Sequence, residues 1–150
     1  MQSRCLKCPP TYRGVREEHA PSTLGPEARM LYRHIELYAA RVGIEPPTLL
    51  SQCRSADQQA AMQAAWDRGD RAGLRSRPAN PENSKHVPDE NGICYAFDLG
   101  NTKAWLNEVG PWVARTVPDA RWGGNFLPRD EPHFDVEPQI KWSSAATFTI

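Results

Sequence analysis

The stretch "GICYAFDLG", residues 92–100, decides the fold of this chain. Apolar and aromatic side chains fill it between two glycines, a pattern that predicts a strand. Asp98 is the one charged residue in the stretch. A carboxylate at that place either caps the helix that follows or belongs to a functional site. The polar residues elsewhere in the chain bear on that choice.

A helix is predicted before this strand, over residues 26–43. Pro26 suits a first helical turn, and Gly43 can end the helix in a left-handed cap. A short buried strand is predicted next, over residues 46–53. The apolar face of the helix is expected to consist of Leu31, Ile35, Tyr38 and Val42.

A second helix is predicted by the pair Ser55 and Gln58, which has the spacing of a capping box. The helix should therefore begin at Ala56 and end near Gly69. Its buried stripe is expected to consist of Ala61, Met62, Ala65 and Trp66.

A third helix is predicted after the strand at 92–100, with Asn101 as its cap and Gly110-Pro111 as an interruption. A closing strand is predicted over residues 133–142. Residues 70–85 form a polar loop that is too long for a plain connector, which favours a functional role. The apolar face of the third helix is expected to carry Trp105, Leu106 and Val109.

These elements predict a single α+β domain over residues 26–150, preceded by an irregular lead-in over residues 1–25. A chain of 150 residues is long enough to bury a core. The 18 basic and 18 acidic residues balance, so charge gives no argument for nucleic acid or an anionic membrane as a partner. No apolar run is long enough to span a bilayer, and the start lacks the apolar region of a secretory signal. The chain is therefore expected in the cytoplasm of the cell that makes it.

The four cysteines show no spacing typical of a small secreted scaffold, which agrees with that expectation. Cys5 and Cys8 form half of a zinc-ribbon pattern without a second half, and a loose, reduced terminus is favoured there. Cys94 lies in the predicted strand and borders the candidate site, and packing within the strand is the favoured interpretation.

Four polar residues form a candidate metal site. His86, Asp98 and His133 are two imidazoles and a carboxylate, which are typical ligands of a catalytic zinc. Asp130 lies three residues before His133 and can act as a general base. This spacing also arises by chance, in which case His86 is a loop histidine and Asp98 a helix cap.

Four motifs in order resemble the zinc peptidases of the D-Ala-D-Ala carboxypeptidase and L-alanyl-D-glutamate endopeptidase family, which includes many phage endolysins. The family patterns are G-Y-R-S-x-x-x-Q, then S-x-H-x-x-G-x-A-x-D, then W-G-G, then D-x-x-H-F. The chain departs from the first pattern at Gln52-Cys53, which replaces Gly-Tyr. The resemblance covers about residues 27–137. The matching residues are Arg54-Ser55, Ser84, His86, Ala96, Asp98, Trp122-Gly123-Gly124, Asp130 and His133-Phe134.

The resemblance implies a role for each matching residue. His86, Asp98 and His133 would be the ligands of Zn²⁺. Asp130 would be the catalytic base, and Arg54 would bind the scissile carbonyl or the developing oxyanion. Supporting roles fall to Ser84, which would orient the loop of the first ligand, and to Trp122, which with the glycines after it would shape the approach to the site.

Two alternatives stay open. His86 and Asp98 are twelve positions apart, further than in the family pattern, so Asp89 competes as the carboxylate ligand. Asp98 is favoured because it keeps the Ala-x-Asp context, whereas the sequence around Asp89 is typical of a turn. Glu131 competes with Asp130 as the base, although its side chain should point the other way in an extended segment.

The resemblance implies the fold of the D-Ala-D-Ala metallopeptidases, also called Hedgehog-like: a small antiparallel sheet flanked by helices. It further implies a monomeric zinc peptidase that cleaves the stem peptides of bacterial peptidoglycan, without binding nucleic acid or inserting into a membrane. A phage or prophage endolysin fits a chain without a signal peptide, because a holin can release it from the producing cell to the wall. A virion-associated lysin, or a non-catalytic zinc-binding or wall-binding module of the same fold, is the alternative, and the bond that is cut stays open.

Overall fold

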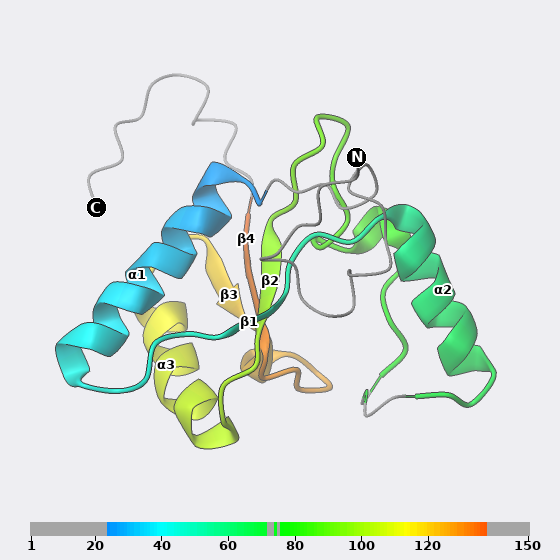
Figure 1. The fold of residues 1–150 in the computed structure, drawn as a ribbon. Helices are drawn as coiled ribbons and strands as arrows, with labels where there is room; N and C mark the ends of the chain where they lie inside the picture. The colour runs from blue at the N-terminus through cyan, green and yellow to red at the C-terminus, as the bar shows by residue number, and fades with distance from the viewer. Residues whose placement is uncertain (1–23, 72–73, 75, 138–150) are drawn as a thin grey trace, which may run out of the picture.

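The computed structural model describes residues 24–71, 74 and 76–137 of the chain. Within these residues four strands form an antiparallel sheet in the order β1-β2-β4-β3 (Figure 1). The expected α+β class with a small antiparallel sheet is confirmed. The strands are β1 (Leu49–Ser51), β2 (Ala96–Leu99), β3 (Ala120–Trp122) and β4 (His133–Val136).

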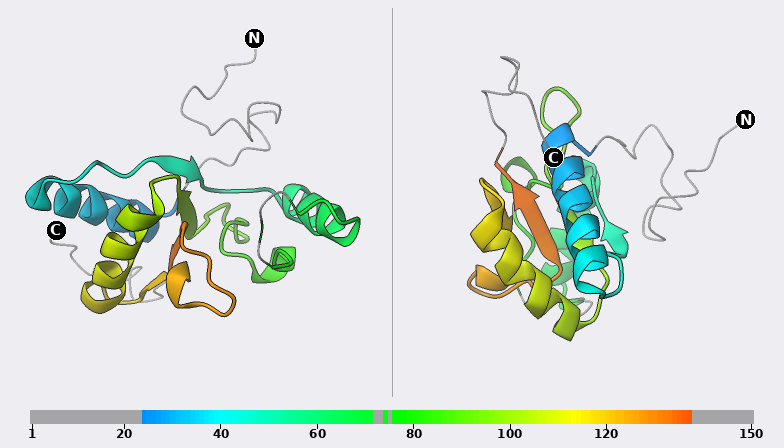
Figure 2. Two further views of the ribbon diagram at one scale, coloured as in Figure 1. Left: turned by 90° about the horizontal axis from the view of Figure 1, so that it is seen from below. Right: turned by 90° about the vertical axis from the view of Figure 1, so that its left-hand side faces the viewer.

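Three α-helices accompany the sheet in the described part of the chain. Figure 1 and the left view of Figure 2 show α1 and α3 together on one side of the sheet and α2 on the other side. No helix in this part of the chain is long and apolar enough to cross a membrane. The helices are α1 (Pro26–Val42), α2 (Ala56–Asp67) and α3 (Lys103–Thr116), with short 3-10 turns η3 (Pro81–Asn83) and η4 (Gly123–Asn125).

Helix α1 has the predicted bounds. Pro26 begins it, and Gly43 ends it with a φ of 78° in the left-handed region. The predicted face is wrong at Val42, which is 43% exposed beyond the edge of the core. Tyr38 is half-buried and stacks on Trp112 of α3. The buried side chains of α1 are Ala28, Leu31, Ile35 and Ala39.

Helix α2 begins at Ala56 with both bonds of the predicted capping box. Its predicted stripe is wrong, because the buried residues are Gln59 and Gln63. Ala61 is exposed, and the other three residues of the predicted stripe are only half-buried. The reason is that α2 contributes nothing to the hydrophobic core and packs instead against the loop around η3.

Helix α3 differs from the prediction in two respects. Thr102 caps it, whereas Asn101 bonds back to Thr48 and to the Pro46 carbonyl. Pro111 lies inside the helix without interrupting it. The reason is that apolar residues on both sides of the proline, among them Val113, are buried in the core and hold the helix together.

Strand β3 lies in a segment to which the sequence assigned no strand. Three residues carry too little alternation to predict a strand, and β3 exists because it pairs with β4. Residues 1–23 of the lead-in, with the Cys5–Cys8 pattern, and the end of the closing strand beyond residue 137 lie outside the described residues.

The core lies between the sheet and the pair α1 and α3. Phe97 of β2 and Phe134 of β4 are fully buried there, with stacked rings whose centroids are 5.8 Å apart. Successive side chains of a strand point to opposite faces, so the residues that flank these phenylalanines face away from the core. Two of these flanking residues are Asp98 and His133, which the candidate site contains.

Candidate metal centre

The sheet register places two of the predicted ligands side by side. Asp98 pairs directly with His133 across β2 and β4, next to the core pair of Phe97 and Phe134. Directly opposite residues of an antiparallel pair have neighbouring side chains on the same face. The same alternation that buries the two phenylalanines therefore brings Asp98 and His133 together.

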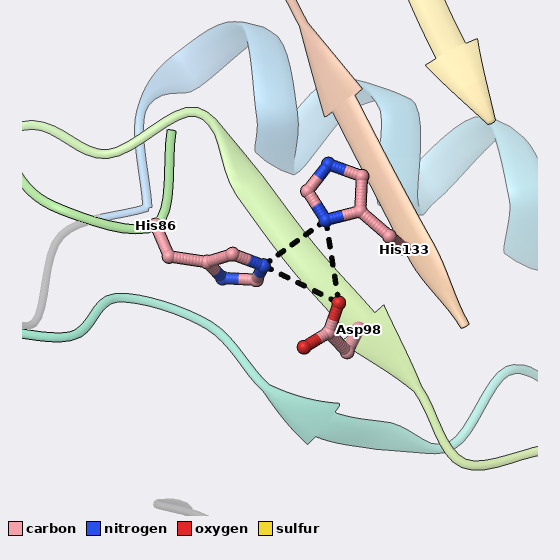
Figure 3. Close-up of side chains that lie close together, drawn as sticks. All are labelled: His86, Asp98 and His133. Carbon is pink, nitrogen blue, oxygen red and sulfur yellow. Dashed lines mark hydrogen bonds and ion pairs between the residues drawn. The ribbon is translucent and has the colours of Figure 1, made fainter. Parts of the chain in front are cut away.

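The third predicted ligand, His86, comes from the loop between η3 and β2 (Figure 3). Its Nδ1 lies 2.7 Å from the carbonyl oxygen of Gln52, which directs Nε2 towards the other two ligands. Its backbone N–H donates to Ser84 Oγ at 3.3 Å, and its carbonyl accepts from Arg54 N–H at 2.7 Å. Ser84 thus contacts the backbone of His86 by a hydrogen bond.

The three side chains form a group that can hold a metal ion, with ligand atoms within 4.8 Å of one another. His86 Nε2 lies 3.3 Å from Asp98 Oδ1 and 3.2 Å from His133 Nδ1. The third edge, between His133 Nδ1 and Asp98 Oδ1, measures 3.5 Å. A tetrahedral ion with zinc-like bonds of about 2.05 Å separates its ligands by about 3.3 Å, whereas octahedral geometry gives about 2.9 Å. The triangle has the size of a tetrahedral face.

The donor set also fits an ion of this kind. Two imidazole nitrogens with one carboxylate suit zinc and other transition metals, whereas magnesium and calcium prefer oxygen ligands. The ligands are not sealed from solvent, since the side chains of His133 and Asp98 are 12% and 14% exposed. A fourth ligand such as water or a substrate oxygen could reach the ion.

Charges in the group are strongly coupled. Burial lowers the pKa of His86, and this effect outweighs the attraction of Asp98. Burial alone would raise the pKa of Asp98, but the two histidines hold it well below its usual range. Burial would lower the pKa of His133, but its hydrogen bonds with Asp135 and Asp98 raise it to about 9. Asp98 is therefore ionised and His86 neutral at neutral pH, as metal ligands must be, whereas His133 is protonated below about pH 9 and would have to release a proton to bind a metal.

Asp135 belongs to the site, although the sequence interpretation gave it no role. It is 1% exposed, and its Oδ2 lies 2.7 Å from His133 Nε2, which leaves Nδ1 for the metal group. Arg121, its partner across β3 and β4, donates two bonds of 2.8 Å to its carboxylate. Burial would raise the pKa of Asp135, but these partners lower it to about 2. The signal was present, because residues two apart on a strand share a face.

The second oxygen of Asp98 is held by β1 and the turn after it. Ser51 Oγ donates to Asp98 Oδ2 at 2.6 Å, and Arg54 Nη2 donates to the same oxygen at 2.9 Å. Asp98 does not cap α3, since Thr102 does. Arg54, expected at a substrate carbonyl, thus lies beside the group and orients its carboxylate ligand.

Asp89, the competing carboxylate, lies outside the group. Its Oδ1 accepts the backbone N–H groups of Asn91 and Ile93, and its Oδ2 accepts the hydroxyl of Tyr95 at 2.9 Å. These bonds close the turn between His86 and β2, as a turn-forming aspartate does. The added residues after His86 form this closed turn, and Asp98 keeps its place on β2.

Asp130 lies close enough to the group to interact with it electrostatically. The residue is exposed, but protein around its carboxyl group excludes part of the water, and this together with the charge of Asp98 raises its pKa. Glu131 is buried and pairs with Arg129 at 3.5 Å. The charges of Asp98, His133 and His86 all act on the carboxyl group of Asp130, the expected base.

The segment from Trp122 to Asp130 is held by close backbone packing. Trp122 is buried, and its Nε1 donates to the Glu131 carbonyl at 2.8 Å. A Cβ at Gly123 would overlap the carbonyl oxygen of Asp130, which itself bonds to the N–H of His133. Glycine is needed at position 123 because the backbone of Asp130 packs directly against it. This contact places Asp130 beside His133.

Cys53 and Cys94 form a disulfide, contrary to the expectation of packed thiols. Both are buried, and their Cα atoms are 5.6 Å apart. Their separation of 41 residues gives no hint of the pairing, which depends on the fold bringing the turn after β1 to the residues before β2. The bridge lies next to both Gln52 and Arg54, which contact the ligands.

Comparison of the chain with protein-family models and with curated proteins finds no match. The order of the motifs and the geometry of the His86, Asp98 and His133 group are therefore the grounds on which a function can be argued.

Proposed function

We propose that this protein is a zinc-dependent peptidase that hydrolyses amide bonds in the stem peptides of bacterial peptidoglycan, as a phage or prophage endolysin does. One observation carries the proposal. Residues from two of the four motifs form a triangle of donor atoms with edges of 3.2, 3.3 and 3.5 Å, and Arg54 of another motif bonds to its carboxylate. Zinc bound by this triangle would supply a Lewis acid that acidifies water and polarises a carbonyl.

Asp130 acts as the general base in this proposal. It accepts the proton of the attacking water and later donates it to the leaving amine. A base that also serves as an acid works best when its pKa lies near the working pH. The raised pKa of Asp130, caused by partial burial and by the charge of Asp98, moves the carboxyl group in that direction.

Arg54 has two tasks in the proposal. A guanidinium carries five N–H donors. The bonds to Gln59, Ser51 and Asp98 use at most three of them, so donors remain for the scissile carbonyl. A fixed positive charge next to this carbonyl stabilises the oxyanion that forms when water attacks.

The test combines metal content with digestion of purified peptidoglycan. The wild-type chain is expected to bind one zinc ion and to clear a suspension of walls. Asp130→Asn should retain the zinc and lose about 10²-fold or more of the rate, the range of a general base. The matched control is Glu131→Gln, which removes the neighbouring carboxylate and should leave zinc content and rate near wild type.

Two results would contradict the proposal. Full clearing by Asp130→Asn would remove this residue from the mechanism. A wild-type chain that binds zinc and adheres to walls without releasing peptides would instead support a non-catalytic wall-binding module.

A further inference from the structure

The inward face of α2 is polar, which is unusual for a buried helix face. Gln59 and Gln63, one turn apart, are 2% and 9% exposed. A buried amide is costly unless it is hydrogen-bonded, so the partners of these side chains explain why glutamine stands here.

Both glutamines donate to the loop that precedes η3. Gln59 Nε2 donates to the Ala79 carbonyl at 2.8 Å. Gln63 Nε2 donates to the Pro78 carbonyl at 3.1 Å and to Asn80 Oδ1 at 2.7 Å. This loop leads through η3 to Ser84 and His86, so α2 anchors the segment that carries the first ligand.

Gln59 makes a further bond that points into the site. Its Oε1 accepts from Arg54 Nη1 at 3.1 Å, while Arg54 Nη2 donates to Asp98. One amide therefore bonds to the ligand-bearing loop with its nitrogen and to the guanidinium with its oxygen. The guanidinium is held on one side by Gln59 and on the other by Asp98 and Ser51.

The two terminal nitrogens of the guanidinium bond to different partners: Nη1 to Gln59 and Nη2 to Asp98. Arg54 has a long side chain that would otherwise sample many rotamers. With Nη2 alone bonded, to Asp98 and Ser51, the group could still pivot about that one nitrogen. The second bond, from Nη1 to the buried Gln59, fixes the plane of the guanidinium and thus the direction of its remaining N–H groups.

We propose that Gln59 is the positioning residue for Arg54, and that it aims the guanidinium at the substrate carbonyl while it anchors the loop of His86. The part of this inference that concerns substrate rests on the proposed function. The part that concerns the orientation of Arg54 rests on the two hydrogen bonds of Gln59 and needs no substrate.

Three variants of the full-length, zinc-loaded chain separate these duties. Gln59→Met keeps the length of the side chain and removes both bonds. Gln59→Glu keeps an acceptor for Arg54 and loses the donor to Ala79. Gln63→Met, the matched control, removes bonds from the same helix to the same loop without touching Arg54.

The readouts are kcat and KM on a soluble stem peptide, thermal stability, and NMR signals of the Arg54 guanidinium, assigned by their loss in Arg54→Lys. Gln59→Met should lose at least about ten-fold in kcat with little change in KM, since a hydrogen bond to a charged group is lost. Its Arg54 N–H signals should merge through free rotation. Gln59→Glu should have most of the wild-type kcat and separate Arg54 signals. Gln63→Met should lose thermal stability but keep the wild-type kcat and the separate Arg54 signals.

The proposal is overturned if Gln59→Met keeps wild-type kcat and separate Arg54 signals, or if Gln63→Met loses kcat to the same extent. If the wild-type chain cleaves no peptide, the proposed function fails and the NMR signals alone decide the role of Gln59. Merged signals in Gln59→Met but not in Gln63→Met would then support it.

Discussion

The metal group has two walls that are built by different means. The sheet wall consists of Asp98, His133 and Asp135 on β2 and β4, and strand pairing sets its geometry. The loop wall consists of residues 52–55 and 78–86, and a few side-chain bonds from α2 and one disulfide hold it. Behind the sheet wall lies the hydrophobic core, whereas α2 behind the loop wall contributes no residue to that core.

The difference concerns how the geometry of a site is secured. A one-residue slip in the sheet would turn every ligand of the sheet wall towards the core, so burial of Phe97 and Phe134 protects the register. The loop wall has no such protection, and each of its contacts can be lost singly. We therefore expect the sheet wall to govern whether the chain folds and the loop wall to govern how well the site is assembled.

The largest effect is expected from the core behind the sheet wall. Phe97→Ala should lower the free energy of unfolding by about 3–5 kcal/mol, because it leaves a cavity under Asp98 and His133. Trp66→Ala, a half-buried aromatic residue on α2, should cost about 1 kcal/mol. Urea unfolding followed by circular dichroism measures both, and equal losses would contradict the difference between the walls.

The next effect concerns the disulfide that ties the walls together. Replacing Cys53 and Cys94 by alanine should lower the free energy of unfolding by about 2–4 kcal/mol, as for a bridge that closes a loop of this size. Zinc affinity should also fall, because Gln52 and Arg54 flank the bridge. Unfolding of the wild type with and without a dithiol reductant is the control. A reduced chain as stable as the oxidised one would contradict the prediction.

A smaller effect tests the sheet wall by itself. Asp135→Asn removes the charge that holds His133 and should weaken zinc binding about 10- to 100-fold, as loss of such partners does at other metal sites. Competition with a chromophoric chelator measures this. The control is Glu137→Gln. Lys85 forms ion pairs with both Asp135 and Glu137, so this variant also removes an acidic partner of Lys85, and it should bind zinc normally. If both variants bind alike, Asp135 does not orient the ligand.

The smallest effect lies in the turn that leads into β2. Burial and the hydrogen bond to Asp89 raise the pKa of Tyr95 to about 12. A raised pKa favours the neutral phenol in the folded chain, so this contribution to stability is complete below about pH 10 and is lost as the pH rises towards 12.

Asp89→Asn should lower the pKa of Tyr95 towards its usual value and leave zinc content unchanged. Phenolate absorbance measures the pKa of Tyr95, with Tyr95→Phe to assign the signal. For zinc content the comparison is Asp98→Asn, which should lose the zinc. Loss of zinc from Asp89→Asn alone would show that the turn, not β2, supplies the carboxylate.

Short-range sequence patterns were sufficient to predict some helices and strands but not others. The ends of α1 and the start of α2 could be predicted because proline, glycine and a capping box act within one turn of helix. The buried face of α2 could not, since apolar periodicity assumes an apolar neighbour and α2 faces a polar loop. Strand β3 was missed because three residues form a strand only through their partner.

The candidate site divides in the same way. The order of motifs pointed to His86, Asp98 and His133 before any geometry was known, and these residues do converge. Asp135 was overlooked although it follows His133 by two positions on a strand. Gln59 belongs to the same motif as Arg54, but its bond to the guanidinium was not predicted, and the bond from Arg54 to Asp98, 44 residues away, depends on the fold.

The sequence by itself determined the class of the fold, the ends of α1, the start of α2 and the residue types of the metal group, because these depend on short-range patterns. The tertiary structure alone decided that Asp98 rather than Asp89 joins the histidines, that Cys53 pairs with Cys94, and that a buried glutamine holds Arg54. The physical reason is that donor distances of about 3.3 Å are set by strand register and loop packing, to which residues far apart in the chain contribute together.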